Sequence, residues 1–346
     1  MILAKSKYAQ EALHVVTELQ TYFAAQLSDV SKEYGKNKPF EKVEWLRDNG
    51  IHGGGSRYES RDETIFTRGS VNVSQVHYDD DETKKLSSAT AISTIIHPQN
   101  PRVPSMHMHI SLTEMRDGKM YWRMMADLNP SIVNEDDKQA FEEMLYKASG
   151  PFYNEGSAQG DRYFYIPLLD RTRGVSHFYL ENFTSGDFVI DRTFSLSFGK
   201  AVIDQYIAII SSAIQNNPKI NEADKKEQLA YHTIYLFQVL TLDRGTTSGL
   251  LVHDQNDVGI MGSIPANIDV ELLKSWIDLM PKPQDNLLEK IIDALGGKGV
   301  VEVDESVKKR LAKSVREHYR AHPKDFLQQT DLPLPLLAVL CLKGKG

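Results

Sequence analysis

The feature of this sequence that most constrains its fold is a strict alternation of residue types from Met106 to Thr113, which read MHMHISLT. Successive side chains of a β-strand point to opposite faces of the sheet. The alternation therefore predicts a strand that is apolar on one face and polar on the other. The apolar face would carry Met106, Met108, Ile110 and Leu112, and the polar face His107, His109, Ser111 and Thr113. Two histidines consequently share one face of the predicted sheet.

Strands are also predicted on both sides of this segment. A short apolar run begins at Ala91 and stops at His97, where a proline-rich turn follows. After the alternating run, the turn sequence Arg116–Lys119 (RDGK) predicts that the chain returns antiparallel towards Asp127. We therefore expect adjacent antiparallel strands between Ala91 and Pro130, with both histidines and the aspartate facing one cavity.

Length and composition limit the class of protein. With 346 residues, 41% of them hydrophobic, the chain can bury the core of one large domain or two ordinary ones. Its 47 acidic and 40 basic residues give a net charge of −7, which argues against nucleic acid or an anionic membrane as the main partner. The one cysteine, Cys341, excludes a disulfide framework and a cysteine-based zinc site.

The sequence also bears on location. The N-terminal residues MILAKSKYAQEALH lack an apolar core long enough for a signal peptide. The most apolar run, residues 332–342, is too short to span a bilayer and contains two prolines. We therefore expect a cytoplasmic protein with no membrane span.

Periodicity elsewhere predicts helices on both sides of a central group of strands. Apolar residues at helical spacing predict helices over residues 13–35, 134–148, 194–214, 221–229, 287–295 and 304–321. Strands are predicted over residues 64–77, 162–166, 177–180, 233–242 and 258–264. This arrangement indicates an α+β protein with a large, mostly antiparallel sheet. From residue 281 onward the sequence pattern is that of helices. We therefore predict a main domain over 1–280 and a helical C-terminal extension over 281–346.

Short motifs follow one another in unbroken order between about residues 40 and 276. They are HGGGSR at 52–57, GSVNVSQVH at 69–77, IIHPQNP at 95–101, PSMH at 104–107, ADLNP at 126–130, RYFYI at 162–166, RGV at 173–175, and LDRGT at 242–246 with GL at 249–250. In this order they resemble the motifs of the oxygen-dependent coproporphyrinogen III oxidases.

The resemblance implies a fold, an activity and a partner. It implies a homodimeric enzyme whose large antiparallel sheet is sandwiched between helices. The enzyme would bind a reduced tetrapyrrole that carries carboxylates, and would convert two propionates into vinyl groups in heme biosynthesis. O2 would be the co-substrate, and neither a metal ion nor an organic cofactor is implied.

The resemblance also assigns roles to residues of this chain, motif by motif. Asp127 in ADLNP would contact the pyrrole N–H groups and act as the central acid or base. His97 and His107 would transfer protons or donate hydrogen bonds on the side where oxygen reacts. The resemblance implies that Asn72, Ser74 and His77 line the floor of the substrate site. We also expect His109, which stands where the family pattern has an asparagine, and Arg57 and Arg173 to bind the substrate.

Two other interpretations remain open. Where the family pattern has arginines that can bind carboxylates, this chain has Ser111, Leu168–Leu169 and Asn256 or a neighbour. This favours a relative on the same fold that binds a tetrapyrrole without catalysis or acts on an altered substrate. In the second interpretation, His107 and His109 form a His-x-His metal-ligand pair that Asp127 completes, as in a metal-dependent hydrolase or oxygenase.

Overall fold

The fold is seen in a computed structural model, which describes residues 1–252 and 255–323. The apolar run at 332–342 and Cys341 lie outside the described residues. The chain forms two compact units. Unit 1 consists of residues 1–161 and 174–220, and unit 2 of residues 162–173 and the described residues from 221 onward.

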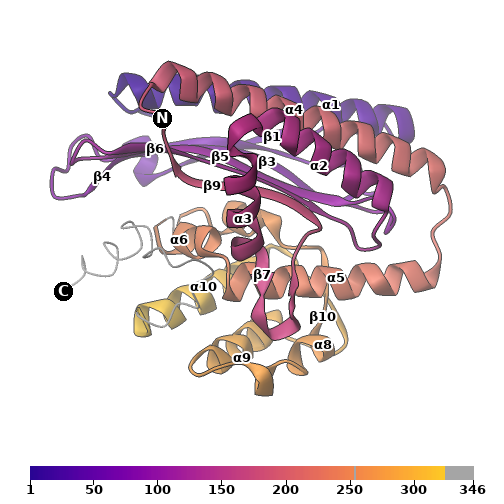
Figure 1. Cartoon of the computed structure of the whole chain (residues 1–346). Coiled ribbons are helices and arrows are strands. Elements are labelled where there is room, and N and C mark those ends of the chain that lie inside the picture. The colour runs from indigo at the N-terminus through magenta and orange to yellow at the C-terminus, as the bar shows by residue number, and fades with distance from the viewer. Residues whose placement is uncertain (253–254, 324–346) are drawn as a thin grey trace. The chain divides into compact units, whose positions relative to one another are not determined.

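Unit 1 contains a seven-stranded sheet and its covering helices (Figure 1). Its strands are β1 (Glu41–Leu46), β2 (Gly53–Glu59), β3 (Phe66–His77), β4 (Leu86–Pro98), β5 (Ser105–Met115), β6 (Met120–Asn129) and β9 (Ser176–Phe183). Its helices are α1 (Lys7–Tyr34), α2 (Glu135–Ser149), α4 (Phe188–Asn216) and most of α3 (Tyr153–Phe164). The protein is therefore an α+β protein, as the sequence predicts.

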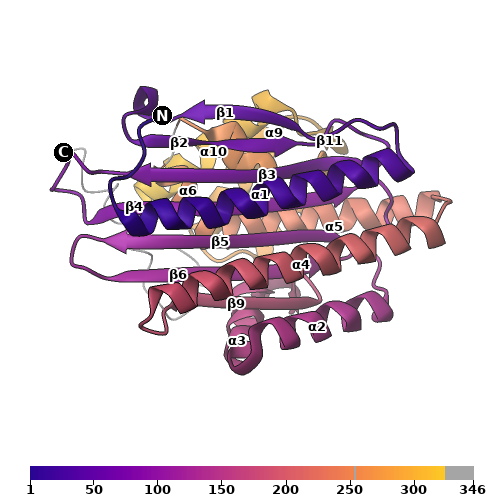
Figure 2. The same cartoon turned by 90° about the horizontal axis from the view of Figure 1, so that it is seen from above.

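All neighbouring strands of the sheet are antiparallel, in the order β1-β2-β3-β4-β5-β6-β9, so that β1 and β9 lie at its edges. Helices α1, α4 and α2 lie side by side across one face (Figure 2). The predicted antiparallel strands between Ala91 and Pro130 are confirmed as β4, β5 and β6. The expectation that helices cover both faces stays a prediction.

The core of unit 1 lies between the sheet and these three helices. The alternating run supplies it with the four apolar side chains of β5, which are at most 1% exposed. Helix α1 contributes an apolar stripe to the same core, from Ala12 through Leu19 and Phe23 to Val30. Hydrophobic burial of this kind stabilises a fold by about 25 cal/mol per Å² of apolar surface. Because side chains alternate along β5, the two histidines lie on its other face.

The ends of α1 and α2 follow from their flanking residues. The hydroxyl of Ser6 accepts hydrogen bonds from the amides of Tyr8 and Ala9, at 3.2 and 3.4 Å, and so caps α1. Helix α1 ends at Tyr34 and Gly35 is its C-cap, in agreement with the predicted end near residue 35. Asn134 caps α2, whose first turn holds three acidic residues that interact favourably with the helix dipole.

Most of the glycine-rich motif at 52–57 lies in strand β2, which begins at Gly53. Its glycines allow close approach to β3, because a Cβ atom at Gly53 would lie 2.1 Å from the carbonyl oxygen of Gln75. A Cβ atom at Gly55 would lie 2.0 Å from the carbonyl oxygen of Val73. These glycines therefore serve strand packing.

Unit 2 is mainly helical. Its helices are α5 (Glu222–Thr241), α6 (Arg244–Val252), α7 (Asp257–Ile260), α8 (Val270–Lys274), α9 (Gln284–Leu295) and α10 (Glu305–Ala321). Its short strands are β7 (Tyr165–Ile166), β8 (Arg171–Thr172), β10 (Asn267–Asp269) and β11 (Val300–Glu302). Helix α5 belongs to this unit. The expected division into a main domain over 1–280 and a C-terminal extension over 281–346 stays a prediction.

Three predicted strands are wrong. Residues 233–242 form the second half of α5, and residues 258–264 form α7 with a 3₁₀ turn. Within 162–166, only Tyr165–Ile166 is extended, since the preceding residues complete α3. The run at 233–242 is buried on nearly all sides. A helix buried all round shows no amphipathic period, so periodicity alone cannot separate it from a buried strand.

The contact between α3 and β9 gives a test of this packing. A Cβ atom at Gly156 of α3 would lie 2.0 Å from the Phe178 ring, which is fully buried in β9. We expect Gly156→Ala to lower the free energy of unfolding by about 1 to 3 kcal/mol, the usual cost of overpacking a core. Urea unfolding followed by circular dichroism measures this change.

Gly249→Ala is the matched control, because it makes the same change in a helix where the nearest atom is 3.7 Å away. Alanine has the higher helix propensity, so this variant should be unchanged or slightly more stable. Equal effects of the two substitutions would contradict the packing described for Gly156.

Candidate functional site

The face of the sheet opposite α1, α2 and α4, here called the polar face, carries most of the residues that the sequence singles out. Strand register places them in adjacent rows. The polar face includes Arg57, Arg68, Ser70, Asn72, Ser74, Ser93, His97, His107, His109, Ser111, Arg123, Asp127 and His177. His107, His109 and Asp127 thus share one face, as the alternation predicts.

Asp127 lies at the centre of one row of this face. Its register partner on β5 is His107, and its partner on β9 is His177. Asp127 is 0% exposed, and each histidine is 8% exposed. The Asp127 Oδ1 atom lies 3.6 Å from His177 Nδ1, which is an ion-pair distance. A buried carboxylate between two imidazoles is a typical arrangement for proton transfer.

Gly174 determines how closely the chain passes this carboxylate. A Cβ atom at Gly174 would lie 1.9 Å from Asp127 Oδ1 and 2.6 Å from the backbone oxygen of Leu128. The amide of Val175 donates a hydrogen bond of 3.0 Å to the same backbone oxygen. A side chain at position 174 would therefore displace the carboxylate.

His177 links Asp127 to a second carboxylate, on α3. The His177 Nε2 atom lies 2.7 Å from Asp161 Oδ1. The close approach depends on Gly160, where a Cβ atom would lie 2.8 Å from His177 Cδ2. Burial disfavours the charged ring, but the carboxylates of Asp127 and Asp161 outweigh it, so the pKa of His177 is raised above its ordinary value of 6.5.

The other two histidines of the polar face have hydroxyl partners. His97 Nδ1 lies 2.9 Å from Ser105 Oγ, and His97 is fully buried. His109 Nε2 lies 3.0 Å from Ser111 Oγ. Desolvation and the charge of Arg123 lower the pKa of His109 to about 3, so its ring is neutral at physiological pH.

The arginines of the polar face lie near acidic side chains. Arg57 Nε donates to Glu59 Oε1 at 2.5 Å, and Arg123 Nη2 donates to Glu181 Oε1 at 3.1 Å. Although desolvation raises the pKa of Glu59, its hydrogen bond and ion pair with Arg57 lower that pKa overall. Both arginines remain charged and can bind an anion only in competition with these carboxylates.

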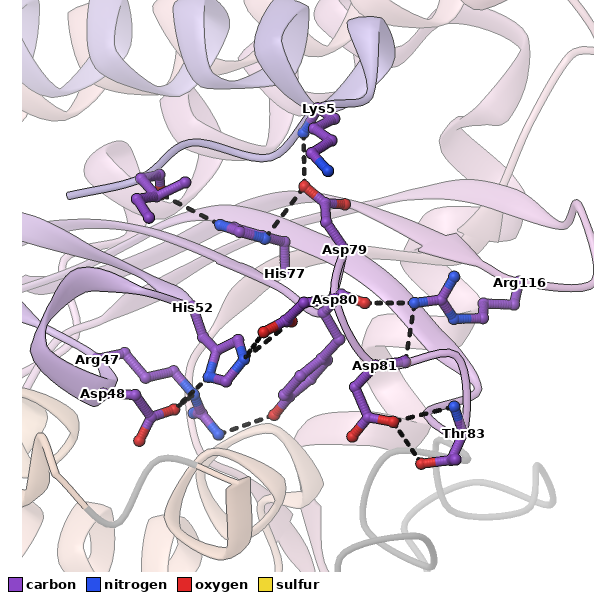
Figure 3. Close-up of polar contacts among 12 residues, drawn as sticks. Lys5, Arg47, Asp48, His52, His77, Asp79, Asp80, Asp81, Thr83 and Arg116 are labelled. Atoms are coloured by element: carbon purple, nitrogen blue, oxygen red, sulfur yellow. Dashed lines mark hydrogen bonds and ion pairs between the residues drawn. The ribbon is translucent and has the colours of Figure 1, made fainter.

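His77 does not lie on the polar face. It follows Val71, Val73 and Gln75 on the face of β3 that α1 covers, where the Gln75 amide donates to the backbone oxygen of Ala9. Its ring lies 3.1 Å from the backbone oxygen of Ile2 and 3.2 Å from Asp79, as Figure 3 shows. The expectation that His77 lies beside Asn72 and Ser74 is therefore corrected, because alternation puts it on the opposite face.

Arg173 belongs to unit 2, and its side chain has partners there. It donates a hydrogen bond of 2.8 Å to Gln238 Oε1 and lies 3.9 Å from Asp243 Oδ2. Its guanidinium lies over the rings of Phe164 and Tyr235, at 4.6 and 4.9 Å from their centroids. These contacts connect Arg173 to Gln238 and Asp243 and give it a structural role within unit 2.

Sequence reasoning did not assign His177, Asp161 or Glu181 to the site. His177 was recognised only as part of a strand. Its position beside Asp127 depends on the pairing of β6 with β9, whose partners are 50 residues apart in the chain. No local pattern contains that pairing.

A metal-ligand set is not assembled in the described part of the chain. Among residues 1–252 and 255–323, no three His, Cys, Asp or Glu side chains are grouped so that they could hold a metal ion. The His-x-His alternative therefore has no set of ligands around His107 and His109 in this region.

Within the same residues, no helix has the length and apolar character needed to cross a membrane.

Comparison with known proteins agrees with the order of motifs. The model of the family described as coproporphyrinogen III oxidase matches residues 11–283. The oxygen-dependent coproporphyrinogen-III oxidase of Rickettsia bellii strain OSU 85-389 is 29% identical over 271 residues, covering 73% of this chain and 94% of that protein. The mitochondrial enzyme of that name from Rattus norvegicus is 26% identical over 281 residues, covering 74% of this chain and 61% of that protein.

The raised pKa of His177 predicts a pH-dependent contribution to stability. Because the folded protein binds this proton more tightly, the contribution is complete below pH 6.5 and is lost as the pH rises through the higher folded-state pKa. We expect the stability difference between the wild-type protein and His177→Gln to narrow as the pH is raised from below 6.5 through neutrality. Urea unfolding at a series of pH values measures it. A difference that widens over this interval would show that the folded-state pKa is not raised.

Proposed function

Because the chain belongs to the coproporphyrinogen III oxidase family, we propose that it oxidises coproporphyrinogen III with O2 and converts two propionates into vinyl groups in heme biosynthesis. The family match extends over both the sheet of unit 1 and the first helices of unit 2. The oxidase of Rickettsia bellii strain OSU 85-389 aligns with this chain over 94% of its own length.

The observation that carries this proposal is the position of Asp127. Its carboxylate is buried at the centre of the polar face, between His107 and His177. A carboxylate in a dry environment forms strong hydrogen bonds with N–H donors and can accept a proton from them. The pyrrole N–H groups of a porphyrinogen all point to the centre of the macrocycle, so one carboxylate can contact them together.

The chemistry requires a base and an electron acceptor. Each propionate that becomes a vinyl group loses carbon dioxide, one proton and two electrons, and O2 accepts the electrons. In the proposed mechanism, Asp127 takes a pyrrole N–H proton, which makes the ring system more electron-rich and easier to oxidise. His107 lies next to Asp127 in the same row, where it can hydrogen-bond to the reacting groups. We propose that no metal ion or organic cofactor takes part.

Substrate binding is assigned to residues around this centre. Asn72 and Ser74 on β3 and His109 on β5 lie in the adjacent rows of the polar face. The neutral ring of His109 can donate or accept a hydrogen bond without adding charge. Arg57, Arg68 and Arg123 are cations of this face that can bind the substrate's carboxylates.

A second candidate is a relative that binds the tetrapyrrole without oxidising it, or that acts on a related substrate. The ion pairs of Arg57 with Glu59 and of Arg123 with Glu181 favour it, because a substrate propionate must displace a carboxylate already present. The intact row of His107, Asp127 and His177 favours the oxidase. Turnover measurements separate the two.

Replacing Asp127 tests the mechanism. We expect Asp127→Asn to lower the rate of oxidation by about two to four orders of magnitude, because the amide keeps the shape but cannot accept the proton. Binding of coproporphyrin should stay within a few-fold. Anaerobically prepared coproporphyrinogen is mixed with enzyme and O2, and the porphyrin products are separated and measured by fluorescence.

Asp161→Asn is the matched control for that experiment, since it makes the same change in a carboxylate that also contacts His177 but is 68% exposed. Its effect should be much smaller. Near-normal turnover by Asp127→Asn would remove Asp127 from the mechanism, and binding without turnover by the wild-type protein would select the second candidate.

We also propose that the protein is a cytoplasmic homodimer, an expectation that comes from the family resemblance and the sequence. Light scattering coupled to size exclusion should give twice the mass of the 39.1 kDa chain at micromolar concentration. A monomer mass throughout that range would contradict the dimer.

A further inference from the structure

We propose that His177 and Asp161 form a proton relay that connects the buried Asp127 with solvent. This inference rests on the function proposed above, in which Asp127 takes a proton in each cycle. Asp127 is 0% exposed and has to release that proton before it can act again. A buried acid or base therefore needs a path to water as well as a suitable position.

His177 lies between a buried carboxylate and an exposed one. Its Nδ1 atom is 3.6 Å from Asp127 Oδ1, and its Nε2 atom is 2.7 Å from Asp161 Oδ1. The side chain of Asp161 is 68% exposed, whereas that of His177 is 6% exposed. The three side chains thus form a continuous path from the centre of the sheet, across β9, to the surface of α3.

The hydrogen bond to Asp161 also determines the state of the ring. A carboxylate accepts a hydrogen bond, so the Nε2 atom of a neutral His177 carries the proton and its Nδ1 atom carries the lone pair. The lone pair then faces Asp127. This tautomer is the one that can accept a proton from a protonated Asp127. The 3.6 Å separation is longer than a hydrogen bond, and such contacts commonly shorten when substrate is bound.

The transfer balances without any other reactant. The Asp127 carboxyl group gives its proton to His177 Nδ1 and becomes a carboxylate. The Nε2–H of the resulting imidazolium gives its proton to Asp161, and Asp161 releases it to water. One proton leaves the site, no electrons move, and Asp127 regains its charge. The neutral ring is left with its proton on Nδ1, so exchange of its ring protons with water restores the Nε2–H tautomer before the next transfer. The raised pKa of His177 makes the first transfer favourable.

The packing of α3 on β9 maintains this path. Gly160 lies against His177 and Gly156 against Phe178, so the helix approaches the strand closely enough for Asp161 to reach the ring. His177 is therefore a positioning and relay residue for Asp127, with no contact to the substrate required.

Removing the imidazole tests the relay. In His177→Ala, we expect kcat to fall by about 10- to 100-fold while KM stays within about twofold, because proton release slows and substrate binding is unchanged. Added imidazole should restore part of kcat in proportion to its concentration, which loss of a structural contact alone would not produce. His177→Gln keeps a polar side chain but leaves no space for imidazole, so it should lose kcat without rescue.

Two further variants make the test specific. Asp161→Asn should lower kcat only a few-fold, and combining it with His177→Ala should cost no more than His177→Ala alone, because both act on one path. His14→Ala, in an exposed position of α1, is the control and should leave kcat unchanged. Full kcat in His177→Ala, or a loss that imidazole does not restore, would overturn the relay while leaving the proposed oxidase activity intact. A wild-type protein without turnover would overturn both.

Discussion

The antiparallel register of β5, β6 and β9 is the constraint on which the rest of unit 1 depends. Side chains alternate between the faces of a strand, so a shift of one residue would exchange the two faces. In the observed register, Met108, Ala126 and Phe178 pack under the helices. The same register leaves the next row for His107, Asp127 and His177. The apolar core and the site are thus determined together, because one register places the apolar side chains on one face and His107, Asp127 and His177 on the other.

Burying Asp127 has an energetic cost that the surrounding residues offset. Transfer of an isolated carboxylate from water to a protein interior is strongly unfavourable unless it is paired. When His177 is protonated, its charge lies 3.6 Å from Asp127 and is itself stabilised by Asp161 near the surface.

The parts of this arrangement that could be predicted from the sequence are those with a local signal. The alternation at 106–113, the turn at 116–119 and the helical spacing over 134–148 and 304–321 are local signals, and the corresponding elements are confirmed. No local signal in the sequence places His177 at the site. Its position depends on the pairing of β9 with β6, in which its partner is Asp127, 50 residues earlier in the chain. The prediction for the second half of α5 was wrong for another reason. Burial on all sides removes the helical period of apolar residues from the sequence.

The charged strand at one edge of the sheet has a consequence for the behaviour of the chain in a crowded solution. Strand β1 ends the ladder, and its exposed residues include Glu41, Lys42 and Glu44. Lys42 and Glu44 form an ion pair of 2.9 Å along the strand. An unpaired edge is a template for strands of other molecules, and charged side chains make such additions unfavourable. The charges on β1 therefore oppose the addition of strands from other molecules at this edge of the sheet. Substitutions that neutralise β1 would promote aggregation without disturbing either Asp127 or the core.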